Sequence, residues 1–456
     1  MSVSRVPASI EARARAASRF GAAFGPRFFI LLAAGFLWIG PAFYEPRVLY
    51  AVPAWDVLVL AVWLIDLVRL PAPAHIAARR SWRSLVALSV ESTARVTVSN
   101  RSDRVIRIRL VDAVPHQLRA EAPTLDLALR PRSEAEGEYR ILPRERGPIA
   151  VGSAYIRYRS PIEIAERWAR VDLDQTIIVY PNIEEARRES MFLIRNRQTD
   201  AERRSRSIRG TGRLFESLRD HQDGDEFRDV CWTASARRGK LITRLYEAER
   251  SQPIWVVIDA GRLMRARLNE VTKLDHAVNA ALTLAQVANS SGDRIGLLAY
   301  GRRVVHSVAP GRGSSHLGEL LRHLALVRAE EGEPDHFGAA ARLMTDQKRR
   351  SLVVWITDVP DVAMTPDVIH AASKLMPRHL VLLVVIGQPD LGAMTRRRPG
   401  RIDEMYRMAA AQEVVHRREL LLARIRVRGA LAIEATGNLS PALVNAYLEV
   451  KQRSRL

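Results

Sequence analysis

The sequence predicts a membrane-anchored protein with several domains: an N-terminal two-helix transmembrane hairpin, a β-sandwich and an α/β domain. Three observations lead to this prediction. Two apolar runs stand close together near the N-terminus, a stretch of alternating apolar and polar residues follows them, and strands alternate with helices in the C-terminal part. A chain of 456 residues is long enough for about three domains.

The charge of the chain is strongly positive. Lys and Arg number 70 against 50 Asp and Glu, which gives a formal net charge of +20. This balance favours an anionic partner such as nucleic acid, acidic lipid or an acidic protein. The single cysteine, Cys231, excludes an internal disulfide framework and a cysteine-cluster zinc site, and it fits a reducing compartment.

Residues 28–70 contain two apolar runs, 28–44 and 48–70, each near the ~20 residues that cross a bilayer. The second run includes Asp56 and Asp66. Arginines are frequent before the first run and after the second, whereas Arg47 alone lies between them. The positive-inside rule therefore places both ends in the cytoplasm. We expect a basic cytoplasmic leader over 1–27 and a multi-pass protein of the inner (cytoplasmic) membrane with its soluble domains in the cytoplasm. A buried helix pair in a soluble protein is the alternative.

Residues 75–183 alternate apolar and polar side chains in short runs, punctuated by Gly, Pro, Asn and Asp. This pattern predicts antiparallel strands and a small β-sandwich, which we interpret as a spacer or interaction domain. Residues 184–250 are dominated by charge and are predicted to form a linker. The basic stretch 203–213 has no aromatic residue for base stacking, so we do not expect nucleic acid to be a partner.

Residues 251–456 alternate continuous apolar strands with amphipathic helices, which predicts a parallel sheet covered on both faces, as in Rossmann-like folds. The strands "PIWVVID" and "LVVWIT" are followed or ended by acids, Asp259 and Asp358. Ligands of such sheets bind at the carboxyl ends of the strands. These two carboxylates are therefore the first candidates for a functional site.

A second candidate precedes the first of these strands, in "GDEFRDVCWTASARRGKL". We name residues 224–241 the GD–W segment. Its acids alternate with arginines, which favours ion pairs or protein docking over phosphate binding. Trp and Arg are frequent anchors of protein interfaces, so the segment either contacts a partner or buttresses the sheet edge. Its candidate residues are Gly224, Asp225, Arg228, Trp232, Ser235, Arg237 and Lys240.

The GD–W segment resembles the pattern of the bacterial "domain of unknown function 58" family. The matching residues are Gly224, Asp225, Arg228, Trp232, Ser235, Ala236, Arg237, Gly239 and Leu241. The chain's ending, "GNLSPALVNAYLEVKQRSRL", is similar to the family's, as is the order of two membrane spans before a β-sandwich. The resemblance implies a C-terminal domain similar to the von Willebrand factor type A domain. It also implies a MoxR-type AAA+ ATPase as partner, because such proteins are typically encoded beside one.

Type A domains usually bind Mg²⁺ through Asp-x-Ser-x-Ser, a Thr and a second Asp. The corresponding residues here are Asp259, Gly261, Leu263, Asp335, Thr357 and Asp358. Both serine positions are lost, and Arg262 adds a positive charge beside them. A hard divalent ion needs oxygen ligands, so we expect a degenerate metal site, no cofactor, and acids paired with arginines. Bound Mg²⁺ is the alternative.

Catalytic motifs are missing elsewhere. "PGRGSSHLG" has no Gly-Lys-Ser/Thr and is not a P-loop, and no Ser/His/Asp arrangement stands out. We therefore expect a non-catalytic adaptor or scaffold that works with a MoxR-type AAA+ ATPase in protein maturation, remodelling or complex assembly, held at the membrane and bound to other proteins. The alternatives are a metal-dependent hydrolase that uses Asp259 and Asp358, and a basic nucleic-acid-binding membrane protein.

Overall fold

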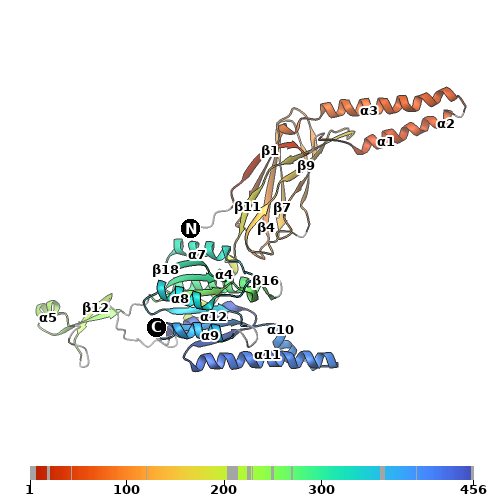
Figure 1. Ribbon diagram of the computed structural model, residues 1–456. Helices are drawn as coiled ribbons and strands as arrows, with labels where there is room; N and C mark the ends of the chain where they lie inside the picture. Colours follow the sequence, from red (N-terminus) through yellow and green to blue (C-terminus); the bar gives the residue numbers. More distant parts are fainter. Residues whose placement is uncertain are drawn as a thin grey trace. The chain divides into compact units, whose positions relative to one another are not determined.

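The computed structural model describes residues 7–17, 21–42, 44–119, 121–202, 214–222, 227, 230–247, 251–268, 271–359, 365–396 and 398–452. The chain divides into two compact units, Ser2–Asn182 and Ile183–Leu456, which are described one at a time (Figure 1).

The first unit is rich in antiparallel strands. Eight strands follow the order β6-β5-β9-β10-β1-β3-β4-β7, with β2 beside β10, while β8 and β11 pair with each other. Arg80 on β3 and Tyr139 on β7 both contact Asp112 on β5, across the interior. The strands are β1 (Ile10–Ala16), β2 (Ala22–Phe24), β3 (Ile76–Trp82), β4 (Ser92–Asn100), β5 (Ile106–Asp112), β6 (Thr124–Leu129), β7 (Ser133–Ile141), β8 (Gly147–Val151), β9 (Ala154–Arg159), β10 (Ala165–Val171) and β11 (Gln175–Val179).

Two of these strands come from the segment expected to be a basic leader. β1 pairs with β3 through residues 10–13 and with β10 through residues 14–16. β2 pairs with β10 as well. The sequence "IEARARA" alternates as a strand does, but its arginines were interpreted as the positive charge of a cytoplasmic leader. The β-rich unit is therefore built from residues on both sides of the apolar helices, rather than from 75–183 alone.

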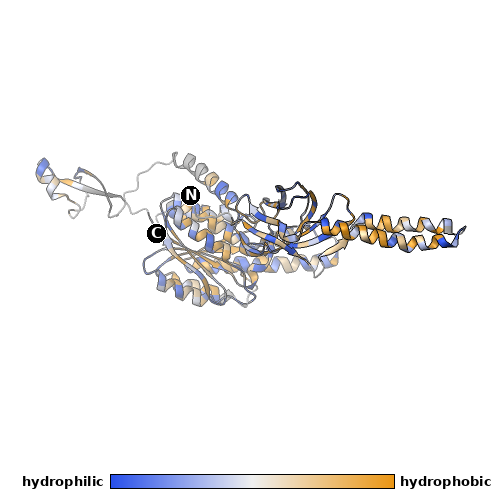
Figure 2. Ribbon diagram, turned by 90° about the horizontal axis from the view of Figure 1, so that it is seen from above, coloured by the Kyte–Doolittle hydropathy of each residue, from blue (hydrophilic) through white to orange (hydrophobic). Residues whose placement is uncertain are grey.

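The apolar region forms a series of helices. They are α1 (Pro26–Ala34), η1 (Gly35–Trp38), α2 (Ile39–Ala42), η2 (Pro46–Tyr50), α3 (Ala51–Arg69) and η3 (Pro73–His75). One helix, over 46–75, is long and apolar enough by length and composition to cross a membrane, and the helix over 26–41 is shorter. α1 and α3 lie alongside each other with many hydrophobic residues (Figure 2), and Trp55 Nε1 donates to the Leu31 carbonyl at 2.8 Å.

Asp66 joins α3 to the β-rich unit. Its side chain is buried and accepts hydrogen bonds from the Ser160 hydroxyl and the Ala165 amide, both at 2.9 Å. Asp56, on the same helix, is exposed. The position of Asp66 in an apolar run is thus explained by packing at the base of the helix.

The second unit is built around a six-stranded sheet of order β18-β17-β14-β19-β20-β21. All neighbours are parallel except β18, which is antiparallel to β17. The edge strand β18 differs from the expected all-parallel sheet because it follows β17 after a tight turn, with no crossover helix between them. The strands are β14 (Pro253–Asp259), β17 (Arg294–Tyr300), β18 (Val304–Gly311), β19 (Leu352–Thr357), β20 (Leu380–Ile386) and β21 (Leu431–Ala435), with a short pair β15 (Arg267–Leu268) and β16 (Val271–Thr272).

Helices cover both faces of this sheet, as its continuous apolar strands predict (Figure 1). α8, α9 and α11 share a core with Trp255 and Trp355 on one face. α6 contacts α4, α7 and α12 on the other. The helices are α4 (Ile183–Glu202), η5 (Arg262–Arg265), α6 (Lys273–Ser290), α7 (Ser314–Leu326), α8 (His336–Asp346), α9 (Thr365–Leu375), α10 (Pro389–Arg396), α11 (Ile402–Val427) and α12 (Leu439–Gln452).

The segment 184–250, expected to be a linker, contains regular structure. Its first part is α4, whose Ser190 hydroxyl donates to Gln286 on α6 at 3.1 Å. Further on, β12 (Leu214–Asp220) and β13 (Ile242–Glu247) form an antiparallel pair, and α5 (Trp232–Arg238) lies between them in sequence. The helix α4 and the β12–β13 pair were not predicted, because the high charge density of this region is typical of a linker.

Candidate functional site

The predicted acids meet at the carboxyl edge of the six-stranded sheet. Asp259 ends β14, and Thr357 ends the neighbouring strand β19. From β14 the chain crosses through α6 to β17 on one side, and it later returns to β19 on the other side. This is a topological switch point, where open α/β sheets place their ligands.

Asp259 is bonded within the protein. It is 2% exposed, its Oδ1 accepts from the Gly261 amide at 2.7 Å, and its Oδ2 accepts from the Thr357 hydroxyl at 2.6 Å. Burial raises the pKa of this carboxyl to about 7, and the charge of Asp358 acts in the same direction, while the two hydrogen bonds lower it. Near neutral pH the group therefore exists in both protonation states.

Asp358 is neutralised by two cations that sequence reasoning missed. The Lys273 ammonium lies 2.5 Å from Asp358 Oδ2, and Arg418 Nη2 lies 3.0 Å from Oδ1. The Lys273 side chain is 1% exposed. Arg418 also reaches Glu434 on β21, at 3.4 Å. These ion pairs join α6, β19, β21 and α11 around one buried carboxylate.

Lys273 could have been noticed from its position. It is the first residue of α6, directly after the N-cap Thr272, and it is one of few lysines in an arginine-rich chain. Its partner is 85 residues away in sequence, so only the parallel packing of β14 and β19 beside α6 brings them together. Arg262, the predicted cation, instead pairs with Glu333 at 2.8 Å.

A loop covers the end of β14. The Arg262 amide donates to the Gly332 carbonyl at 3.0 Å, and the Glu330 amide donates to the Ala260 carbonyl at 2.7 Å. A Cβ at Gly261 would lie only 2.6 Å from Pro334 Cδ, so glycine is required by close packing. Leu263, at the second lost serine position, is half-buried. The site is closed over Asp259.

Asp335 has a local role. It is the N-cap of α8, and its side chain accepts from the Gly338 amide at 2.8 Å. Such a cap satisfies one of the unpaired amides at the start of a helix. The carboxylate is thus engaged by its own helix rather than directed at Asp259.

These residues do not fit a Mg²⁺ site. A hard divalent ion needs several free oxygen ligands, whereas Asp259 and Asp335 accept bonds from protein donors and Asp358 holds two cations. Within the described parts of the chain, no three His, Cys, Asp or Glu side chains are arranged to hold a metal ion.

A second buried polar cluster lies beneath this edge. The Tyr300 hydroxyl accepts from Trp355 Nε1 at 2.8 Å and lies 2.8 Å from His336 Nδ1. Burial lowers the pKa of His336 to about 4, so the ring is neutral at physiological pH. The cluster is part of the core, since all three side chains are buried.

The GD–W segment separates into structural and exposed residues. Gly224, Asp225 and Arg228 lie outside the described residues. Ser235 is buried; its hydroxyl donates to the Cys231 carbonyl and accepts from the Ile242 amide, both at 2.9 Å, which ties α5 to β13. Gly239 ends α5 with a φ of 65°, a conformation that favours glycine.

The other described candidate residues of the segment, Trp232, Arg237 and Lys240, are exposed. Trp232 is 64% exposed, and Arg237 is exposed on the same short helix. Lys240 pairs with Asp220 at 2.7 Å in an exposed ion pair. Ser235 and Gly239 therefore hold a rigid turn that displays an aromatic ring and a guanidinium group.

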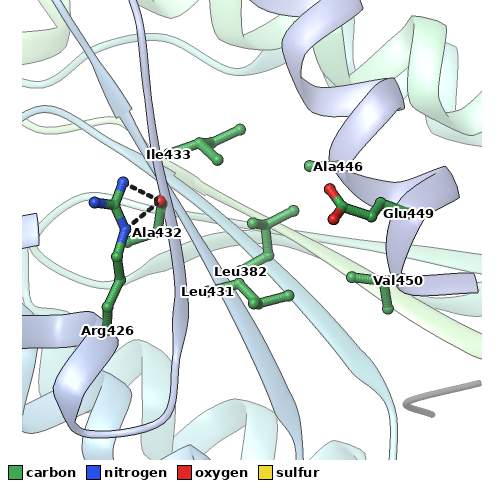
Figure 3. Close-up of a pocket in the computed structure, with 8 residues that line it drawn as sticks. All are labelled: Leu382, Arg426, Leu431, Ala432, Ile433, Ala446, Glu449 and Val450. Atoms are coloured by element: carbon green, nitrogen blue, oxygen red, sulfur yellow. Dashed lines mark hydrogen bonds between the residues drawn. The ribbon is translucent and has the colours of Figure 1, made fainter. Parts of the chain in front are cut away.

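A small cavity lies at the other end of β21 (Figure 3). Leu382 and Leu431 line it, α12 closes one side, and Arg426 donates to the Ala432 carbonyl at 3.2 and 2.9 Å. Its volume is ≈ 150 Å³. Substrate pockets are usually about 300 Å³ or larger, so this cavity is too small to be a substrate site.

Residues 217–393 match the family described as "Protein of unknown function DUF58". The match begins before the GD–W segment and ends in α10, so it includes that segment and the acids Asp259 and Asp358. It confirms the resemblance seen in the sequence.

Two curated relatives align with part of the chain. "Uncharacterized protein YeaD" of Bacillus subtilis (strain 168) is 27% identical over 237 residues, which is 52% of this chain and 55% of the relative. "Uncharacterized protein Rv1480" of Mycobacterium tuberculosis (strain ATCC 25618 / H37Rv) is 28% identical over 186 residues, covering 40% and 57%. The chain thus spans little more than half the length of these curated relatives.

Solved structures are among the chain's matches, and one of them is a von Willebrand factor A (VWA) domain. BatB from Bacteroides thetaiotaomicron has 13% identity and a TM-score of 0.29, covering 45% of this chain and 100% of that chain. The SpRpn10 VWA domain has 13% identity and a TM-score of 0.27, covering 43% and 95%. The α/β architecture itself rests on the strand order described above.

Proposed function

We propose that this protein is a non-catalytic, membrane-anchored adaptor or scaffold whose α/β domain binds other proteins. The observation that supports it most is the state of the strand-end acids. Asp259 is buried and bonded, and Asp358 is neutralised by Lys273 and Arg418. A hydrolase would need these carboxylates free to reach a substrate or a metal ion, so their bonding favours the adaptor over the hydrolase alternative.

The membrane anchor in this proposal is the helical region 26–70. The helix over 46–75 has the length and composition of a span. The pairing of β1 with β3 supports two crossings rather than one. Because these strands flank the helices in sequence and are neighbours in one sheet, both flanks lie on the same side of any membrane. The charges of the flanks favour the cytoplasmic side.

The docking surface in this proposal is the exposed part of the GD–W segment. Trp232 and Arg237 belong to residue types that dominate protein interfaces, and the bonds of Ser235 hold them on a fixed turn. The expected partner is a MoxR-type AAA+ ATPase, as the resemblance to the family implies. The process would be protein maturation, remodelling or complex assembly. Nucleic acid is the weaker alternative, because many of the arginines are paired with acids, as Arg95, Arg109 and Arg157 are.

Co-purification from native membranes in mild detergent tests the proposal. The wild-type protein is expected to retain an AAA+ ATPase in stoichiometric amount, and a Trp232→Ala/Arg237→Ala variant is expected to lose it. A Trp168→Ala/Arg170→Ala variant is the matched control, because it removes an exposed Trp and Arg from the β-rich unit. Absence of any ATPase from intact wild-type preparations, or equal loss in both variants, would contradict the proposal.

A further inference from the structure

A cavity on the β-rich unit brings four arginines together, and we name it the arginine cavity. Arg107 and Arg109 on β5 lie opposite Arg159 and Arg157 on β9 in the strand register. Side chains two residues apart on a strand share a face, so all four line the same surface of the sheet. The cavity volume is ≈ 290 Å³.

Carboxylates hold these guanidinium groups in place. Arg109 donates to both oxygens of Asp126, at 2.7 and 3.1 Å, and Arg107 donates to Glu163 at 2.9 Å. Glu166 is nearly inaccessible and pairs with Arg157 at 2.5 Å and Arg159 at 2.8 Å. A guanidinium has five N–H donors in a fixed fork, so each arginine is oriented and keeps further donors for a ligand.

The charge of the cavity suits one monoanion. Four arginines face the three carboxylates Asp126, Glu163 and Glu166, which leaves a single net positive charge. A phosphodiester carries one negative charge, and its oxygens match the guanidinium fork. Arg157 and Arg159 are 37% and 26% exposed, so they are accessible from the cavity while partly shielded from water.

The cavity lies where the apolar helices meet the β-rich unit. Glu163, in its wall, is 3.9 Å from Arg27 in the first turn of α1. The same loop carries Ser160, which donates to Asp66 of α3, and the exposed side chain of Ile162. A phosphodiester at this place would come from a lipid headgroup once the helices are in a bilayer.

We propose that the arginine cavity binds the phosphate of an anionic phospholipid headgroup. The proposal rests on the membrane anchor of the proposed function and adds a lipid-specific contact beside it. Basic side chains near the surface of an anionic leaflet each contribute to membrane affinity, and their effect increases when they converge on one headgroup.

Native mass spectrometry of the full-length protein tests this. The detergent-solubilised protein is mixed with equal amounts of phosphatidylglycerol and phosphatidylcholine with identical acyl chains, and the ratio of the two bound lipids is measured. The wild type is expected to prefer phosphatidylglycerol. The variant Arg107→Gln/Arg159→Gln is expected to lower this preference about fivefold or more. Arg95→Gln/Arg140→Gln is the matched control, since it removes two paired arginines elsewhere in the same unit and should keep the preference.

Three outcomes would overturn the proposal. The cavity variant keeps the wild-type ratio; or the control loses it equally, which would indicate a general charge effect; or inorganic phosphate abolishes the preference, which would indicate free phosphate as the ligand. Membrane fractionation of the cells that produce the protein distinguishes a failure of the lipid proposal from a failure of the membrane anchor. A wild type absent from the membrane fraction contradicts the anchor, whereas a membrane-bound protein without lipid preference contradicts only the arginine cavity.

Discussion

The ammonium group of Lys273 shows how one side chain can determine the chemistry of a site. It lies against Asp358 in a buried ion pair, and Arg418 completes the neutralisation. Removing one member of a buried pair leaves an uncompensated charge, which costs far more than the pair itself contributes.

Lys273→Met should therefore lower the free energy of unfolding by about 3–5 kcal/mol. Chemical denaturation of the purified protein measures this. The double variant Lys273→Met/Asp358→Asn should lose less than the single variant, because it removes both charges. Lys240→Met is the control, as it breaks an exposed Lys–Asp pair and should cost about 1 kcal/mol or less. Equal losses for Lys273→Met and Lys240→Met would contradict the account of the site.

His336 predicts an effect of pH on stability. Its folded pKa of about 4 is below its ordinary value of 6.5, because burial disfavours the charged ring. As pH falls, the unfolded chain therefore takes up a proton at His336 before the folded chain does. The contribution of His336 to the free energy of unfolding is thus present above pH 6.5 and is lost as pH falls towards the folded pKa of about 4.

When the pH is lowered from about 7.5 to about 5, the free energy of unfolding of His336→Gln should rise by about 2 kcal/mol relative to that of the wild type. The comparison must be made as a difference, because the raised pKa of Asp259 acts in the opposite direction: its contribution is present at low pH and lost as pH rises towards about 7. Unfolding curves of both proteins at the two pH values measure the difference. Parallel pH dependence of the two proteins would show that His336 titrates normally.

At the scale of elements, α3 is fastened to the strands by a carboxylate rather than by apolar packing alone. Asp66 accepts from Ser160 and from the amide of Ala165 at the start of β10. The C-terminal end of α3 is thus fixed to the β-rich unit.

Asp66→Ala should leave both donors without a buried acceptor, at a cost of about 1–3 kcal/mol for each. Hydrogen exchange of the Ala165 amide should become faster. Asp56→Ala removes an exposed acid from the same helix and should leave this exchange unchanged. If both substitutions have the same effect, the bonds of Asp66 are not what holds the helix.

The elements also show what the sequence could and could not predict. The central strands and their acids were predictable, because continuous apolar runs ending in Asp259 and Asp358 are typical of buried parallel strands. β1 was missed because Arg13 and Arg15 dominate its outward face. The partners of Asp358 were missed because pairing across 85 residues depends on tertiary packing, which local patterns do not contain.

At the scale of the whole chain, the N-terminal residues are part of a folded unit. β1 contacts β3 and β10 along its length. Deleting residues 1–17 should therefore destabilise the β-rich unit, whereas a loose leader could be removed without effect. Limited proteolysis of the full-length and truncated proteins measures this. A truncated protein whose β-rich unit resists protease as well as wild type would contradict the role of β1.

The place of β1 in the sheet also determines the order of events during synthesis. β1 is synthesised before the other strands of this unit, yet its partner β10 is made about 150 residues later, which takes on the order of ten to thirty seconds. Residues 10–13 can pair with β3 as soon as the helices and β3 have been made, whereas the backbone groups of residues 14–16 wait for β10. The arginines of β1 oppose pairing with other nascent chains, as charged residues do on edge strands. The β-rich unit is therefore completed late. Its last strands can pair only after the apolar helices have been inserted and the chain has come back to β1.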